Sequence, residues 1–226
     1  NTTALVADKT VHRALDRFGG IEEVNSAIAH RPQLPMAVTE RLVALVSDHL
    51  REHLIVHHEL SPDTATDLTL HSREKALLGL VADSDQRTEL ADLVHGLQSH
   101  GRLTPSLILR ALLTGDIDFF EHATAELAKI SISSAHILIH DAGGRGLEAL
   151  HRQCQFPNEM LPIMRSAINV IAETQYDGGK ADRPRYAERV IERILTQLDG
   201  PLDGDQVDWL IRRLVSAQKA IHATVN

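Results

Sequence analysis

The stretch GRLTPSLILRALLTGDIDFFEHATAELAKI, residues 101–130, predicts two consecutive α-helices over residues 104–114 and 117–129. Leucine and alanine, which are strong helix formers, fill both segments, and little in them alternates with the two-residue period of a strand. Leu103-Thr104-Pro105 precedes the first helix. A proline in the first turn presets the helical φ angle and lacks an N–H that would have no partner there. This stretch therefore favours an all-α fold.

The same pattern extends in both directions along the chain. An apolar residue just before a proline-marked helix start recurs at Leu34-Pro35, Leu60-Ser61-Pro62 and Phe156-Pro157. Short helices joined by such turns are typical of antiparallel helix pairs stacked as in HEAT repeats, although the spacing here is irregular. Besides the two helices above, we expect a helix that ends at Gly19-Gly20, a helix that stops before Pro32, and helices over about residues 34–46, 48–58, 62–71, 73–82, 85–99, 133–140, 147–154, 158–176, 184–198 and 204–223.

One segment marks a boundary between domains. YDGGKADRPR, from Tyr176 to Arg185, is rich in glycine and charge and predicts a linker or an exposed turn. We therefore expect a HEAT-like helical repeat domain over residues 1–176, and C-terminal amphipathic helices over residues 177–226 that pack on it. Trp209, the only tryptophan, is expected to anchor a core in the last helix.

The composition excludes some classes of function. With 31 acidic and 23 basic residues, the formal charge of −8 argues against nonspecific binding to nucleic acid or to an anionic membrane. Because the 14 histidines become positively charged in mild acid, the sign of the net charge depends on the pH. No apolar run approaches the roughly 18 residues that a membrane span needs. We expect neither nucleic acid nor membrane as a partner.

The single cysteine, Cys154, excludes an intrachain disulfide and favours a reducing compartment. We therefore expect a cytoplasmic protein. Because the sequence begins with Asn1 rather than Met, we also expect a fragment or a processed chain.

One short motif suggests metal chemistry. His49-Leu-Arg-Glu52-His53 matches the H-x-x-E-H pattern of inverted zinc peptidases, in which two histidines bind zinc and the glutamate is the base. Glu121 or Glu126 offers a distant carboxylate as a third ligand. However, no sheet is predicted that would build the mixed α/β domain of such peptidases. We favour packing of these histidines beside an apolar stripe, with adventitious binding of Ni, Cu or Zn as an alternative. No metal or cofactor is predicted, and His49, Glu52 and His53 are the residues to test.

Two further features have a structural interpretation. Gly143-Gly144-Arg145-Gly146 precedes a predicted helix, where N–H groups and the Arg145 guanidinium attract anions. The sequence lacks both the Gly-Lys-Ser/Thr and the G-x-G-x-x-G patterns of phosphate loops, so a helix stop with a left-handed glycine is favoured.

Cys154 lies on an apolar-patterned helix and is expected to be a small buried residue rather than a nucleophile.

The order of these blocks resembles a known family. An Arg31-Pro32, Leu34-Pro35 turn is followed by GRLTPSL, RAL and Gly115-Asp116 with Phe119-Phe120, and then by DAGGRGL and Phe156-Pro157. Over about residues 25–176 this is similar to the bacterial domain of unknown function family number 2336. The resemblance implies HEAT-type helical repeats and an occurrence largely in alphaproteobacteria, but no activity or ligand.

We expect a non-enzymatic helical-repeat scaffold that binds another protein in a bacterial signalling or regulatory assembly. The alternative is a metal-dependent hydrolase that uses His49, Glu52 and His53.

Overall fold

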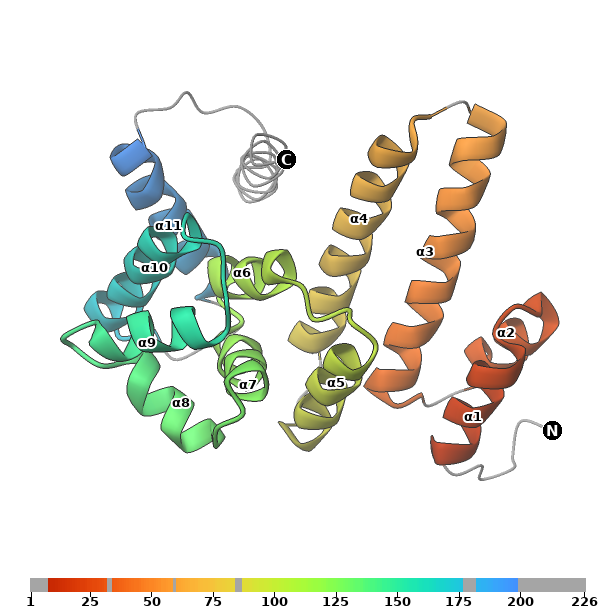
Figure 1. Cartoon of the computed structure of the whole chain (residues 1–226), viewed down its shortest axis with the longest axis horizontal. Helices are drawn as coiled ribbons and strands as arrows, with labels where there is room; N and C mark the ends of the chain where they lie inside the picture. The colour runs from red at the N-terminus through yellow and green to blue at the C-terminus, as the bar shows by residue number, and fades with distance from the viewer. Residues whose placement is uncertain (1–7, 32–33, 59, 84–86, 177–181, 199–226) are drawn as a thin grey trace. The chain divides into compact units, whose positions relative to one another are not determined.

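The chain is represented by a computed structural model that describes residues 8–31, 34–58, 60–83, 87–176 and 182–198 (Figure 1). These residues form helices and no strand, which confirms the all-α prediction. The helices are α1 (Asp8–Phe18), α2 (Glu22–Ala29), α3 (Met36–His58), α4 (Pro62–Asp83), α5 (Arg87–Ser99), α6 (Pro105–Thr114), α7 (Ile117–Ala128), α8 (Ile132–Ile139), α9 (Arg145–Gln153), α10 (Met160–Thr174) and α11 (Arg183–Leu198). The helix predicted at 204–223, with Trp209, lies outside the described residues.

Two predicted helix breaks are wrong. Residues 34–46 and 48–58 belong to the single helix α3, and residues 62–71 and 73–82 to the single helix α4. Neither helix contains glycine or proline where the break was expected. Ser47, at the first of these positions, donates its hydroxyl hydrogen to the Val43 carbonyl oxygen at 2.7 Å, an arrangement that fits within a continuous helix.

The chain divides into two compact units, Asn1–Leu93 and Val94–Asn226. In the first unit, α1 and α2 pack on the first half of α3 through a cluster of Val11, Leu15, Ile28, Val38 and Leu42. α3 and α4 form a long hairpin, which Figure 1 shows as two antiparallel helices. The predicted domain boundary between residues 176 and 177 stays a prediction.

The second unit is built around α6. Seven of its ten residues are buried, and α7, α10 and α11 pack against it. The Thr104 hydroxyl oxygen accepts the Leu107 N–H at 3.1 Å and caps the start of this helix, as the Thr-Pro sequence predicts. Gly115 ends the helix in the left-handed conformation, with φ of 86°.

Side chains at the end of α10 and the start of α11 contact the turn between α6 and α7. The Tyr176 hydroxyl donates to the Gly115 carbonyl oxygen at 2.9 Å, and the rings of Tyr176 and Tyr186 stack with their centroids 4.6 Å apart. The Arg183 guanidinium donates to the buried carboxylate of Asp116 at 3.0 and 3.4 Å. Ring stacking and ion pairing therefore fix α11 against the turn that begins α7. None of the helices in the described ranges is long and apolar enough to cross a membrane.

Candidate functional site

The residues of the H-x-x-E-H motif lie on the exposed second half of α3. His49, Glu52 and His53 are all exposed, and the His53 ring lies 4.4 Å from that of His57 and 5.7 Å from that of His58, between centroids. The prediction that these histidines pack between helices is therefore wrong. The physical reason is that, among the described residues of the first unit, α1 and α2 cover only the first half of α3, and the second half packs on α4 alone.

A different set of side chains converges in the second unit. Within the described ranges, three potential metal ligands lie close together: Glu121, His136 and His140. Their donor atoms all lie within 4.8 Å of one another, and they are called here the His/Glu cluster. Glu121 lies on α7, His136 lies on α8, and His140 is the residue that ends α8. The hairpin of α7 and α8 brings these residues together.

Local sequence sets the geometry of this hairpin. Lys129 ends α7 in the left-handed conformation, with φ of 55°, and reverses the chain. Ser131 then caps α8 by accepting the Ser134 N–H at 3.1 Å. His136 and His140 are four residues apart, which places them on one helix face with ring centroids 4.6 Å apart.

Both imidazole rings point to one oxygen atom. His136 Nδ1 lies 2.9 Å and His140 Nε2 lies 2.8 Å from Glu121 Oε1. The Glu121 side chain is 10% exposed, that of His140 is 27% exposed and that of His136 is 60% exposed. The cluster therefore runs from a buried carboxylate to the protein surface.

The charge of Glu121 depends on these two neighbours. Burial raises its pKa, but the hydrogen bonds from His140 and His136 and the positive charge that they can carry lower it more, so the net pKa lies below its ordinary value. Glu121 is thus ionised at neutral pH. An ionised carboxylate that faces two imidazole nitrogens can share protons with them or hold a cation.

Glu126, the other acidic residue proposed from sequence as a distant ligand, does not join this cluster. Its carboxylate oxygen lies 2.9 Å from His95 Nδ1, in a pair whose histidine is 73% exposed. A histidine–carboxylate pair at that exposure is screened by water and has little effect on stability.

The glycine-rich turn before α9 is a chain reversal, as predicted, but no glycine ends the preceding helix, because α8 ends at His140, whose φ is −93°. Gly144 has φ of 67° and precedes the first residue of α9, in the left-handed conformation that the sequence predicts. The carboxylate of Asp141 accepts the Gly143 N–H at 3.3 Å and the Gly146 N–H at 3.1 Å. These bonds occupy N–H groups that a phosphate would need, and the negative charge of Asp141 opposes an anion at this turn.

Cys154 has the character of a structural cysteine. Its side chain is half-buried, and its Sγ lies 3.7 Å from the Thr124 carbonyl oxygen. Burial raises the pKa of the thiol to about 11. A thiol with this pKa carries almost no thiolate at neutral pH, so Cys154 is not an activated nucleophile.

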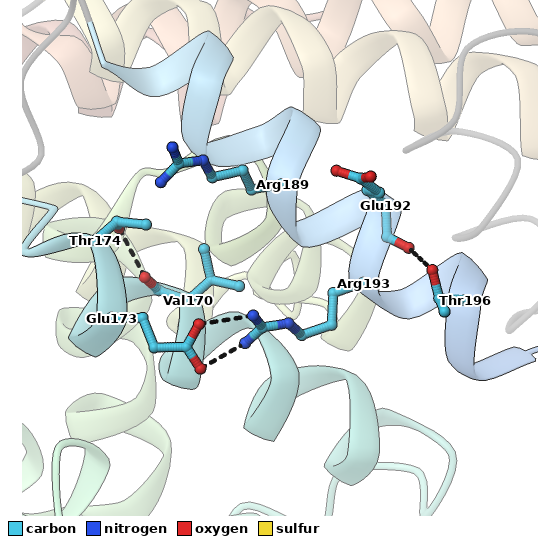
Figure 2. A pocket seen from close by; sticks show the side chains of 7 residues that line it. All are labelled: Val170, Glu173, Thr174, Arg189, Glu192, Arg193 and Thr196. Atoms are coloured by element: carbon cyan, nitrogen blue, oxygen red, sulfur yellow. Dashed lines mark hydrogen bonds and ion pairs between the residues drawn. The ribbon is translucent and has the colours of Figure 1, made fainter.

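A groove of about 530 Å³ lies between α10 and α11. Figure 2 shows Arg193 directing its two terminal guanidinium nitrogens to the carboxylate of Glu173. These nitrogens donate to Oε1 and Oε2 at 2.8 and 2.6 Å. Arg189 and Glu192 line the same groove, and Glu192 accepts the Thr196 hydroxyl hydrogen at its backbone carbonyl. Because the lining contains two acidic residues, Glu173 and Glu192, and two basic residues, Arg189 and Arg193, the groove offers no concentrated charge of one sign to a ligand.

The sequence matches the model of a known protein family. A family model described as an uncharacterised protein conserved in bacteria, domain of unknown function 2336, matches residues 1–200. The chain belongs to this family. The match confirms the resemblance and extends it beyond residues 25–176 in both directions. Neither a curated protein nor a solved structure matches the chain at a significant level.

The His/Glu cluster of this family member was only partly visible in the sequence. Glu121 could be proposed as a ligand, but for the wrong histidines. The H-x-x-x-H spacing of His136 and His140 is the signal that could have found the other two residues, since it places both rings on one helix face.

Proposed function

We propose that the protein is a non-enzymatic cytoplasmic scaffold that binds another protein through exposed aliphatic side chains on α3 and α4. The exposed aliphatic side chains of these two helices are Val46, Leu50, Val56 and Leu68, called here the α3–α4 apolar surface. Val56 lies about 120° from Leu50 around α3, so the surface extends over more than one face of that helix. The single cysteine supports the reducing compartment, and the helical hairpin supports the scaffold.

The main support for this proposal is that the two halves of α3 differ in the burial of their side chains. Its first half buries five side chains, Met36, Val38, Glu40, Leu42 and Ala44. Residues 46–58 contain no buried side chain, and the exposed fractions of Val46, Leu50 and Val56 are 62%, 48% and 70%. Leu68, on the facing helix α4, is 52% exposed. Full burial of one such side chain contributes about 1.5–3 kcal/mol, so a partner that covers this surface gains substantially.

The arrangement of these residues suits a partner with an apolar contact face. Val46 and Leu50 are four residues apart and therefore lie on one face of α3, and His53 continues that face at the next turn. Aliphatic residues beside an aromatic imidazole, with charged residues such as Asp48 and Glu52 around them, give the apolar centre and polar rim of a protein interface.

The alternative function, a metal-dependent hydrolase at His49, Glu52 and His53, has less support. All three side chains are exposed, and no further ligand from the described ranges completes a set with them. A hydrolytic zinc site needs three protein ligands and a shielded position for water.

The scaffold proposal is tested by adding charge to the surface. Leu50→Asp is compared with Ile137→Asp, which makes the same change at a 69% exposed aliphatic residue on α8. A partner is first isolated from a lysate of the bacterium that encodes the chain, and its affinity is then measured with purified proteins by calorimetry. We expect Leu50→Asp to weaken binding at least about 10-fold, equivalent to about 1.4 kcal/mol, and Ile137→Asp to leave it unchanged.

Light scattering on the purified chain provides the second measurement. A dimer that Leu50→Asp dissociates would show that the surface binds a second copy of the chain instead. Equal affinity of the wild type and of both variants for every isolated partner would reject the surface as the binding site.

A further inference from the structure

We propose that Glu121, His136 and His140 form a binding site for one divalent transition-metal ion, with zinc as the cation that fits the donor set. The site lies in the second unit, whereas the α3–α4 apolar surface lies in the first, so this inference does not depend on the proposed scaffold function.

The donor set is the first argument. Two imidazole nitrogens and one carboxylate are the three protein ligands of many zinc sites that keep an open fourth position. Imidazole suits zinc, iron, copper and nickel, whereas magnesium and calcium take oxygen ligands almost exclusively. The cluster therefore selects a transition metal over the abundant alkaline-earth cations.

The distances are the second argument. Zinc bonds of about 2.0–2.1 Å in a tetrahedral arrangement place the ligand atoms about 3.3–3.4 Å apart. The two nitrogen atoms now lie 2.9 and 2.8 Å from Glu121 Oε1, and the three donor atoms all lie within 4.8 Å of one another. The two oxygen-to-nitrogen edges must each open by about 0.5 Å, a change that small rotations of the imidazole rings achieve.

The fold also restricts the positions of the three ligands. The Glu121 side chain is only 10% exposed, on a helix in which Phe120 and Thr124 are fully buried, so burial restricts the movement of this ligand before the ion arrives. The i,i+4 spacing holds the two rings over that carboxylate. The 60% exposed side chain of His136 leaves the outer side of the cluster open to water, which provides both an entry path and a fourth ligand.

The competing explanation is a structural one, in which both rings donate hydrogen bonds to Glu121 and no ion binds. In that case His136 carries its proton on Nδ1 and His140 carries its proton on Nε2, and both protons occupy the position that the metal would take. The two explanations differ in whether the cluster exchanges these protons for a cation at neutral pH.

Zinc binding to tag-free protein, dialysed against a chelator and then titrated in competition with a chromophoric zinc indicator, tests the site. We expect one zinc ion per chain, bound at least about 10-fold more weakly by His136→Ala and by Glu121→Gln. His53→Ala, in the exposed histidines of α3, is the matched control and is expected to bind zinc as the wild type does. Mg²⁺ in excess should not displace the zinc.

Cobalt provides a readout of geometry. Co²⁺ bound in place of zinc should give the visible absorption of a four- or five-coordinate site, and His136→Ala should abolish it. His136 is mostly exposed, so this variant is expected to fold, and its thermal unfolding without metal verifies this. Absence of stoichiometric zinc in the wild type would overturn the proposal. Zinc loss in His53→Ala rather than His136→Ala would overturn it as well and would assign the metal to α3.

Discussion

The ion pair between Asp116 and Arg183 gives a prediction whose size and pH dependence both follow from burial. The Asp116 side chain is 5% exposed and that of Arg183 is 22% exposed. Replacing Arg183 by Met keeps most of the side-chain length but leaves a buried carboxylate without its cation. Breaking a buried pair in this way costs about 3–5 kcal/mol, and the partial exposure of Arg183 places the loss near the lower limit, at about 3 kcal/mol at pH 7.

The sign of the pH dependence follows from the pKa of Asp116. Burial raises this pKa above its ordinary value, while the charge of Arg183 and its hydrogen bonds lower it in part. A raised carboxyl pKa means that the folded state holds the proton more tightly than the unfolded state, so the contribution of Asp116 to stability is fully present at low pH and is lost as the pH rises through the folded-state pKa. Arg183→Met raises that pKa further. Its destabilisation should therefore be largest at pH 7 and should shrink toward pH 4, near the ordinary pKa of an aspartate.

The free energy of unfolding is measured by urea titration with far-UV circular dichroism at pH 7 and pH 4, for the wild type, Arg183→Met, Asp116→Asn and the double variant. Hydrogen exchange in α7 and α11 assigns the change to the second unit. Arg193→Met, which removes the cation from the exposed carboxylate of Glu173, is the control and should cost far less. Equal loss at both pH values, or a loss below about 1 kcal/mol at pH 7, would refute the argument.

Three further outcomes are expected. Gly146→Ala should destabilise the protein by about 2–3 kcal/mol in chemical denaturation, because a Cβ there would lie 2.3 Å from the Leu138 carbonyl oxygen. Gly143→Ala is the control, because its Cβ would meet nothing closer than 3.5 Å. Equal losses of stability in the two variants would contradict the packing argument. Thr104→Ala should cost about 1 kcal/mol through loss of the cap of α6, and an unchanged urea midpoint would show that the cap is dispensable. Alkylation of Cys154 at pH 8 should be about 100-fold slower in the folded protein than in urea, because burial raises the pKa of the thiol to about 11. Equal alkylation rates would show that the thiol is accessible and that its pKa is not raised.

Local sequence was sufficient to predict those features of the fold that depend on the residues of a single turn. Thr104-Pro105 marked the start of α6, and the left-handed glycine before α9 was expected from Gly143-Gly144. The helix ends predicted within α3 and α4 failed because Ser47 and Ser72 break no backbone bond, and periodicity alone does not show where a helix with no breaker residue stops.

The sequence by itself determined the helical character of this protein and its family, since leucine- and alanine-rich segments with proline starts favour helices whatever they pack against. Which side chains meet was decided only by tertiary structure. Glu121 is 15 residues from His136 and 19 from His140, and a single hairpin angle brings all three within hydrogen-bonding reach. The His49 motif had the better sequence pattern, yet it lies on the half of α3 that the described parts of α1 and α2 do not cover. Spacing along one helix fixes the direction of a side chain, but its burial and its partners depend on the helices that pack around it.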